Sequence, residues 1–151
     1  MTDPVLSSLL RINRQRIKTL RRTVLNPNGY VGVMHLIVLY AGRHPGASQE
    51  DVVAFFALDK ASVARGARRL EELGHLRREQ DPVDRRQYRL FLTEGGEEMR
   101  RIIDRAHLDF QRQLSQGVSL EDWAALAALL ERLAENCGRA DVKMKFDIAS
   151  Y

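Results

Sequence analysis

The sequence predicts a mainly α-helical protein that carries one small β-hairpin. Three observations predict this fold class. Apolar residues recur at helical spacing through most of the chain. Two short helix signals stand close together near its middle, as in a helix-turn-helix. A pair of strand-like segments around a turn follows them directly.

Size and composition fit a soluble globular protein. A chain of 151 residues accommodates one domain, or one domain with a dimerisation extension. Apolar residues make up 44% of the chain and charged residues 29%, which is enough for a core and a hydrated surface. No apolar run reaches the roughly 18 residues that cross a bilayer. The first residues lack the layout of a secretion signal, so we expect a cytoplasmic protein with no membrane partner.

Charge is distributed unevenly along the chain. Residues 11–22 hold six basic residues and no acidic ones, and residues 60–89 hold nine basic and five acidic ones. Residues 93–151 hold eight basic and eleven acidic residues, so the surplus of basic residues lies before residue 93. This distribution favours binding to a polyanion such as nucleic acid. Because charge runs usually face water, the alternative is a set of solvated faces.

A long first helix is predicted to begin at Asp3. Asp3 suits the N-cap position and Pro4 the first helical position. An apolar stripe at spacings of four and three follows, interrupted by Asn13, and it consists of Leu6, Leu10, Ile17, Leu20 and Val24. A chain this short has little else to cover such a stripe, so we expect a partner subunit.

The sequence "NPNG" at residues 26–29 predicts a turn after the first helix. A second helix is expected from about Tyr30 to Gly42. This segment is apolar nearly all round, which indicates a central place in the core. A buried strand is the competing interpretation, because valine and isoleucine are frequent in it.

Two short helices are predicted next. Ser48 with Asp51 three residues later resembles a capping box. Asp59 caps a second helix that runs to about Leu73, where Gly74 ends it in the left-handed conformation. Their close spacing predicts a helix-turn-helix whose second helix, about 59–73, is the recognition helix.

The segments "LRREQ" and "QYRLFL" predict a hairpin at about residues 76–92, with a turn at residues 81–84. A hairpin directly after a helix-turn-helix is the wing of a winged helix. Thr93 then caps a long helix to about Gln116, and Ser119 caps a last helix to Cys137. The expected dimer interface combines the first and last helices through Leu6, Leu10, Ile17, Leu20, Trp123 and Leu130.

The recognition helix has two chemically different sides. Val63, Ala67 and Leu70 face inward at helical spacing, while small residues and guanidinium groups lie opposite. Such a face fits guanine edges and phosphates in the major groove. The expected DNA-binding residues are Lys60, Ser62, Arg65, Arg68 and Arg69, with Arg85 and Arg86 at the tip of the wing. The alternative is a surface helix whose arginines pair with Glu71 and Glu72.

The wing tip suits the minor groove, because a thin loop that carries arginines can enter it. Asp84 cannot help to bind an anion, so we expect it to stabilise the wing by holding an arginine or capping the turn. Asp81 and Asp84 could also be a catalytic carboxylate pair, but neighbouring arginines would lower their pKa values and prevent general-acid catalysis.

No other catalytic or metal chemistry is indicated. Metal-ligand spacing is absent among His35, His44, His75 and His107, and no phosphate loop or nucleophile elbow occurs. We therefore expect no enzyme activity, cofactor or metal. The single cysteine, Cys137, continues the apolar stripe of the last helix and is expected to be a small buried hydrophobe. A redox-sensing thiol is the alternative function.

Residues 48–96, and within them "DPVDRR" leading to "LTEGG", resemble the winged helix of MarR-type (multiple antibiotic resistance) transcriptional regulators. The resemblance implies an obligate homodimer that binds a palindromic operator in double-stranded DNA. It assigns residues 1–28 to an N-terminal dimerisation helix, residues 29–95 to the winged helix, and residues 96–151 to C-terminal dimerisation helices and a tail. It also implies that Asp84 is the wing aspartate that ties an arginine in place.

Many MarR-type proteins act as repressors that a small phenolic or amphipathic molecule releases from DNA. The helices that should line such a site offer Arg16, Tyr30, His35 and Tyr40 as polar contacts. A winged helix that binds protein instead of DNA is a further alternative. The sequence departs from the family pattern at Gly66, inside the recognition helix, and at the two phenylalanines of "AFFALDK".

Overall fold

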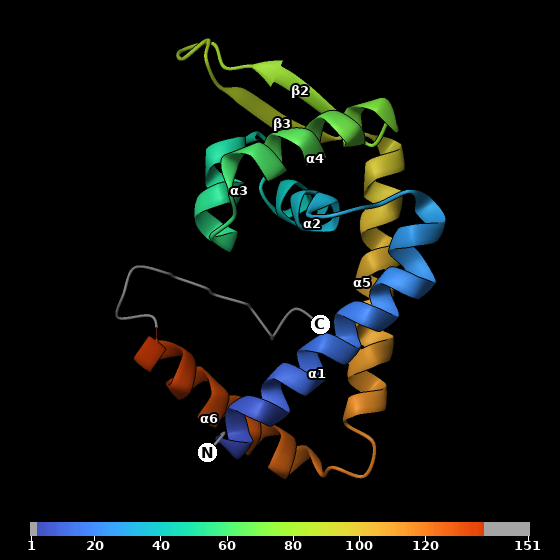
Figure 1. The fold of residues 1–151 in the computed structure, drawn as a ribbon, viewed down its shortest axis with the longest axis vertical. Helices are drawn as coiled ribbons and strands as arrows, with labels where there is room; N and C mark the ends of the chain where they lie inside the picture. Colours follow the sequence, from blue (N-terminus) through green and yellow to red (C-terminus); the bar gives the residue numbers. More distant parts are fainter. Residues whose placement is uncertain (1–2, 138–151) are drawn as a thin grey trace. The chain divides into compact units, whose positions relative to one another are not determined.

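The computed structural model describes residues 3–137, apart from the side chain of Cys137. The chain order is α1 (Pro4–Leu20), a π-helical segment η1 (Arg21–Leu25), a 3-10 segment η2 (Asn26–Asn28), α2 (Met34–Arg43), β1 (Ala47–Ser48), α3 (Gln49–Phe56), α4 (Lys60–Glu72), β2 (Leu76–Gln80), β3 (Tyr88–Leu92), α5 (Glu94–Leu114) and α6 (Leu120–Cys137) (Figure 1). The predicted mainly α fold with a small β wing is confirmed. Among the described residues, no helix is long and apolar enough to cross a membrane.

The chain forms two compact units, residues 1–107 and residues 108–151, and α5 runs from the first into the second. The first unit holds the helix-turn-helix (α3 and α4) and the wing. In the second unit, α6 begins at the predicted cap, where the Ser119 hydroxyl accepts a hydrogen bond from the Asp122 amide at 3.0 Å. Leu126, Leu129 and Leu133 form an exposed apolar row along α6.

The predicted helix caps are confirmed. The Asp3 carboxylate accepts hydrogen bonds from the Val5 and Leu6 amides and begins α1. Ser48 and Asp51 form a complete capping box at α3. Asp59 accepts from the Ser62 amide at 2.8 Å and begins α4. These caps satisfy amides that have no partner within their own helix, so each helix start is fixed locally by the sequence.

The start of α2 and the number of strands differ from the prediction. Helix α2 begins at Met34, four residues after the expected Tyr30, because Gly32 has a positive φ of 55° that interrupts any helix. The alternative of a buried strand is wrong for this segment. Residues Ala47–Ser48 form a third strand, β1, which is too short to give an alternating pattern.

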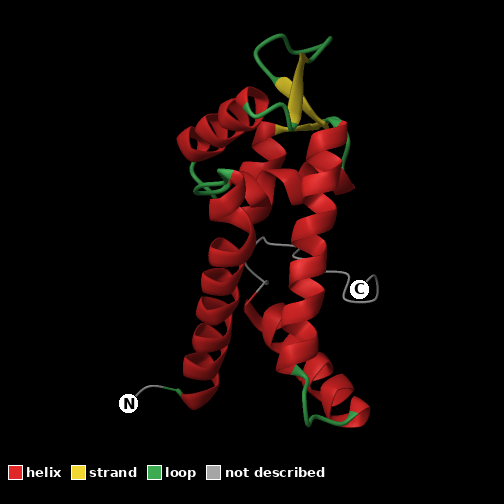
Figure 2. Ribbon diagram, turned by 90° about the vertical axis from the view of Figure 1, so that its right-hand side faces the viewer, coloured by secondary structure: helices red, strands yellow, loops and turns green. Residues whose placement is uncertain are grey.

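The three strands form one antiparallel sheet in the order β1-β3-β2. Leu76 of β2 pairs with Leu92 of β3, and Ala47 of β1 pairs with Leu90. Strand β3 is therefore central, and its Leu90 is completely buried. Beyond the paired residues the β2–β3 hairpin continues as a loop that projects from the helices (Figure 2). This loop is the tip of the wing.

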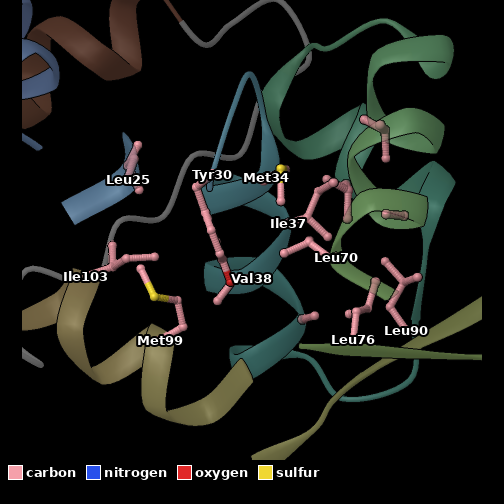
Figure 3. Packing of buried hydrophobic residues seen from close by; sticks show 14 of the residues in the cluster. Leu25, Tyr30, Met34, Ile37, Val38, Leu70, Leu76, Leu90, Met99 and Ile103 are labelled. Atoms are coloured by element: carbon pink, nitrogen blue, oxygen red, sulfur yellow. The ribbon is translucent and has the colours of Figure 1, made fainter. Parts of the chain in front are cut away.

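A single apolar core joins the helices and strands of residues 1–107 (Figure 3). Helix α2 lies at its centre and buries Met34, Ile37 and Val38 completely. Further buried side chains come from η1, α3, α4, the sheet and α5, among them Leu25, Val52, Val63, Ala67, Leu70, Leu76, Leu90, Met99 and Ile103. Burying one such large side chain contributes about 1.5–3 kcal/mol, so α2 contributes much of the stability.

Leu20, which we expected at a dimer interface, lies in this core instead and is 3% exposed. The π-helical turn η1 directly after it carries Val24 and Leu25 into the core as well. The apolar stripe of the first helix is therefore divided. Its last part packs within the chain, and Leu6 and Leu10 remain exposed.

Gly96 in the first turn of α5 is expected to tolerate no side chain. A β-carbon there would overlap the backbone carbonyl of His75, which cannot move without disturbing the wing. Gly96→Ala should lower the free energy of unfolding by about 1–3 kcal/mol, measured by guanidinium denaturation.

Gly95→Ala is the matched control, because its β-carbon would lie 3.2 Å from a carbon atom of the His75 side chain. That side chain can adjust, and alanine is the better helix former by about 1 kcal/mol. Equal stabilities of the two variants would contradict the close contact at Gly96.

Candidate nucleic-acid interface

Helix α4 separates a buried face from an exposed one. Val63, Ala67 and Leu70 are completely buried, and the arginines of the helix lie on the other side. Gly66 belongs to the buried face, because a β-carbon there would lie 2.8 Å from Ile37 Cδ1. The glycine departs from the family pattern and costs helix stability of about 1 kcal/mol, but it lets α4 approach α2 closely.

The outer face of α4 carries the five side chains of this helix that we expected to contact DNA, namely Lys60, Ser62, Arg65, Arg68 and Arg69. Arg65 donates a hydrogen bond from Nη2 to the Ser62 hydroxyl at 3.0 Å, which orients this guanidinium group within the helix face. Arg69 pairs with Glu72 at 2.8 Å, and both side chains are half exposed. Lys60 and Arg68 are exposed and form no ion pair within residues 3–137.

The recognition helix is attached to the wing by a charged pair that we did not expect. Glu71 of α4 accepts a hydrogen bond from Arg78 Nε of β2 at 2.6 Å. Both side chains are mostly buried, with exposed fractions of 31% and 21%. The guanidinium group of Arg78 also lies over the Tyr88 ring, 5.1 Å from its centroid. Glu71 therefore binds β2 of the sheet and does not pair with the arginines of α4.

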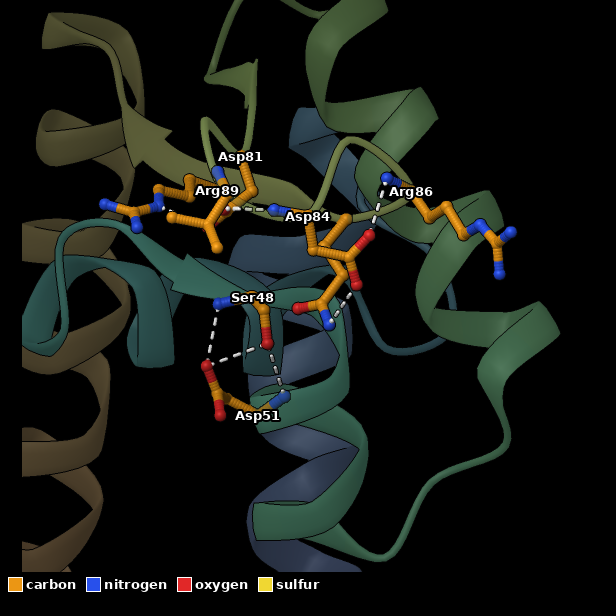
Figure 4. Close-up of polar contacts among 8 residues, drawn as sticks. Ser48, Asp51, Asp81, Asp84, Arg86 and Arg89 are labelled. Atoms are coloured by element: carbon orange, nitrogen blue, oxygen red, sulfur yellow. Dashed lines mark hydrogen bonds and ion pairs between the residues drawn. The ribbon is translucent and has the colours of Figure 1, made fainter.

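Asp81 organises the loop between β2 and β3 (Figure 4). Its Oδ1 atom accepts hydrogen bonds from the Val83 amide at 2.7 Å and the Asp84 amide at 2.9 Å. Its Oδ2 atom accepts from Arg89 Nε at 2.7 Å. These backbone amides and the Arg89 guanidinium lower the pKa of Asp81 to about 2. A carboxyl group with such a pKa is a structural anion and not a general acid.

Asp84 caps the turn and does not hold an arginine side chain. Its Oδ1 atom accepts from the Arg86 backbone amide at 3.0 Å, and its Oδ2 atom accepts from Gln87 Nε2 at 3.2 Å. The expectation that Asp84 ties an arginine is therefore corrected: Asp81 does so, through Arg89. Asp81 directly follows β2 and Arg89 lies on β3, eight residues later, and the sequence alone did not reveal their pairing.

Arg85 and Arg86 lie exposed in the loop and form no ion pair with any described carboxylate. Gln80 Nε2 donates to the Arg85 carbonyl at 2.7 Å, so the backbone at the loop tip is fixed while the side chains are not. The wing thus offers two guanidinium groups on an ordered backbone. This arrangement suits an anion such as a phosphate group.

A buried polar cluster lies elsewhere in the first unit, where the charge of Arg16 of α1 acts on His35 of α2 and on His107 of α5. Asp104 stands one helical turn before His107 on α5. Burial, with the charges of Arg16 and Arg21, lowers the pKa of His35 to about 4. Burial, with the charge of Arg16 and the proximity of His35, also lowers the pKa of His107 to about 4. Both imidazoles are therefore neutral at pH 7. His107 was not among the residues we expected at a ligand site.

Three atoms of this buried polar cluster have no hydrogen-bond partner within residues 3–137. They are His35 Nδ1, His107 Nε2 and Asp104 Oδ1. Burial raises the pKa of Asp104, and Arg100 lies 3.2 Å from its other oxygen. Leaving a buried polar atom unsatisfied costs about 1–3 kcal/mol, so a cluster with three such atoms is a candidate site for a polar ligand.

Tyr30 and Tyr40, the other residues expected near a ligand, have different surroundings. The Tyr30 hydroxyl lies 2.9 Å from His75 Nδ1. The Tyr40 ring packs among His44, Phe55 and Phe56, with centroid distances of 4.6, 5.0 and 6.1 Å. The two phenylalanines of α3 therefore belong to an aromatic cluster on α2 and α3.

Within the described part of the chain, no group of three or more histidine, cysteine, aspartate or glutamate residues could hold a metal ion. The side chain of Cys137 lies outside the described residues.

Comparison with known proteins agrees with this architecture. The model of the MarR family (MarR_2) matches residues 32–87. A transcriptional regulatory protein assigned to the hcr operon of Thauera aromatica is 29% identical over 112 residues, which are 74% of this chain and 68% of that protein. A crystal structure of MarR is 31% identical, covers 92% of this chain and 96% of its own, and superimposes with a TM-score of 0.80.

The chain belongs to the MarR family. It is thus a MarR-family transcriptional regulator with a DNA-binding winged helix, and not an enzyme. A further structure shares the fold at 23% identity and a TM-score of 0.70, covering 87% of this chain and 99% of its own. It is BpsR of Bordetella bronchiseptica, whose DNA binding is regulated by 6-hydroxynicotinic acid.

The wing of this MarR-family chain should depend on the charge of Asp81. Asp81→Asn removes the anion that binds two amides and Arg89, so hydrogen exchange of the Val83 and Asp84 amides should accelerate about tenfold. Because the pKa of Asp81 is lowered on folding, this contribution is present above pH 4 and is lost as the pH falls towards 2.

Asp109→Asn is the control, since Asp109 only meets Arg112 at 3.4 Å on the exposed surface of α5. Unchanged exchange of the wing amides in Asp81→Asn would show that the turn does not need this carboxylate.

Proposed function

We propose that the protein is a homodimeric, sequence-specific repressor that binds a palindromic operator in the cytoplasm and leaves it when a small aromatic anion binds. The observation that carries this proposal is the exposed face of α4, where guanidinium groups stand opposite a completely buried apolar face. In such a helix the backbone is held rigidly by the core while the arginines are free to reach base edges.

Within α4, Arg65 is the best candidate for direct base recognition. It lies in the first half of the helix, which enters the major groove most deeply in helix-turn-helix proteins. The hydrogen bond that Arg65 donates to the Ser62 hydroxyl limits its rotamers before DNA binds, so less conformational entropy is lost on binding. Lys60, Arg68 and Arg69 then serve as phosphate contacts or secondary base contacts.

The wing completes the proposed interface. Asp81 and Asp84 fix the loop backbone, and Arg85 and Arg86 remain available for the minor groove or its phosphates. Guanidinium groups are attracted to the negative potential of a narrow minor groove. The wing would therefore add affinity at the flanks of the half-site that α4 reads.

Exposed apolar residues support a homodimer. Leu6 and Leu10 of α1 are 60% and 63% exposed, although their neighbours in the stripe are largely covered. In the second unit, Leu129 of α6 is 55% exposed, beside the half-buried Trp123 and Leu130. A second copy that covers both helices would remove these apolar surfaces from water.

Sedimentation equilibrium measures the mass of the protein in solution and should give the mass of two chains. A monomer would contradict this part of the proposal.

The buried polar cluster supports an anionic effector. Arg16 carries a charge that burial destabilises, and the adjacent His35 and His107 are neutral imidazoles with unpaired nitrogen atoms. A carboxylate with an aromatic ring would pair with the guanidinium and hydrogen-bond to the imidazoles. The related BpsR responds to 6-hydroxynicotinic acid, which has this chemistry.

Arg65→Ala should weaken binding to the operator by about 1–3 kcal/mol and relax the base preference at one position of each half-site. The operator is first selected from fragments of the source genome with the purified protein, and affinity is measured by fluorescence anisotropy. The slope of affinity against salt concentration should remain steep, because phosphate contacts persist.

Arg101→Ala is the matched control, since Arg101 is an exposed arginine of α5 that pairs with Glu98 at 2.6 Å. Retained affinity and footprint in Arg65→Ala would remove this residue from the interface. Binding of the wild-type chain without salt dependence or footprint would instead favour a protein-interaction module.

Arg16→Ala should raise the concentration of 6-hydroxynicotinic acid or benzoate needed for half-maximal release of DNA by about tenfold, because a charge-assisted contact is lost. Arg14→Ala, an exposed arginine on the same helix, should leave the release unchanged. If neither acid releases the wild-type protein at millimolar concentration, the proposal of an aromatic anion as effector is wrong.

A further inference from the structure

Tyr30 and His75 are joined by a hydrogen bond between residues 45 positions apart. The Tyr30 hydroxyl lies 2.9 Å from His75 Nδ1. Tyr30 is 1% exposed, and burial raises the pKa of its hydroxyl, which therefore stays protonated. The roles of donor and acceptor in this contact depend on the His75 tautomer. A tyrosine hydroxyl can either donate or accept a hydrogen bond, so the pair can form one hydrogen bond with either tautomer.

Tyr30 is attached to the end of the first helical segment. Its backbone amide donates to the Leu25 carbonyl at 2.9 Å. Leu25 is the last residue of η1 and is 2% exposed, and its side chain lies in the same core as Tyr30 (Figure 3). A displacement of α1 and η1 would therefore carry Tyr30 with it.

His75 stands where α4, the wing and α5 meet. Its amide donates to the Leu70 carbonyl in α4 at 2.9 Å, and its carbonyl accepts from the Thr93 amide, just before α5, at 3.2 Å. The Thr93 hydroxyl donates to the Gly74 carbonyl at 2.6 Å. Gly96 of α5 packs so closely on the His75 carbonyl that no β-carbon fits. The turn at residues 74–75 is thus bound to three elements at once.

We propose that Tyr30 and His75 are positioning residues that set the orientation of the recognition helix and wing relative to α1. Neither residue needs to touch DNA. His75 lies between the C-terminal end of α4 and the start of β2. The Tyr30 hydroxyl contacts it and links it to η1 and α1, while Thr93 and Gly96 contact it and link it to α5. The inference rests on the proposed sequence-specific binding of DNA and deepens it.

Loss of this hydrogen bond should affect base recognition more than phosphate binding. Base contacts depend on the depth and angle of α4 in the groove, whereas phosphate contacts tolerate small rotations of a charged surface. A side-chain hydrogen bond contributes enough to change an equilibrium about two- to tenfold. The predicted effect is therefore a loss of selectivity in a protein that remains folded.

Tyr30→Phe tests the proposal, because it removes only the hydroxyl. The probes are a duplex enriched from a random library by the wild-type protein and a scrambled duplex of equal length. Affinity for the enriched duplex should fall about two- to tenfold, while affinity for the scrambled duplex and its salt dependence stay unchanged. Tyr40→Phe is the control, since the Tyr40 hydroxyl forms no hydrogen bond with the described residues and its ring packs on Phe55.

A second pair of variants separates positioning from stability. His75→Asn keeps a polar atom near the position of Nδ1 and should retain more selectivity than His75→Leu. If Tyr30→Phe lowers the melting temperature but keeps full selectivity, the contact is only structural and the inference is overturned. If the wild-type protein itself fails to distinguish the two duplexes, sequence-specific binding is overturned and this inference with it.

Discussion

The burial of the inward face of α2 is the constraint on which the rest of the first unit depends. Met34, Ile37 and Val38 are completely enclosed, so every element around them must match their shape. The recognition helix meets this demand through Gly66, which removes a β-carbon where Ile37 Cδ1 approaches. The position of α4 is therefore set by the packing of α2, and only its outer face is free to evolve for DNA.

The buried polar cluster is unusual beside such an apolar core, because three of its polar atoms have no hydrogen-bond partner among the described residues. His35 belongs to α2 itself, and with Arg16 and His107 it brings charge and unpaired nitrogen atoms to the edge of the apolar core. Replacing buried charged groups by apolar residues of similar volume is often neutral or stabilising in proteins. Their presence supports a functional interpretation, because a ligand that satisfies these atoms would bind there and stabilise the helices around it.

The sequence was informative wherever the structure is determined locally. Caps such as Asp3 and Asp59, and the two-faced pattern of α4, depend on neighbours within a few residues. The start of α2 was missed because a left-handed Gly32 interrupts an otherwise helical pattern. Asp81 and Asp84 could not be distinguished by spacing, since both stand beside arginines, and only the hairpin register brings Arg89 to Asp81. His107 gave no signal, because its partners lie on other helices.

The contacts between α4 and the wing also limit how a ligand could act on DNA binding. Glu71 binds Arg78, and His75 is held by Leu70 and Thr93, so α4 and the wing are fastened to each other at two places. Such a unit moves as one body more easily than it deforms. In the proposed homodimer, a ligand between α1, α2 and α5 would then act by changing the separation of the two winged helices. Helix-turn-helix dimers bind half-sites one helical turn apart, about 34–36 Å, so a small change in that separation would misalign one winged helix with its half-site.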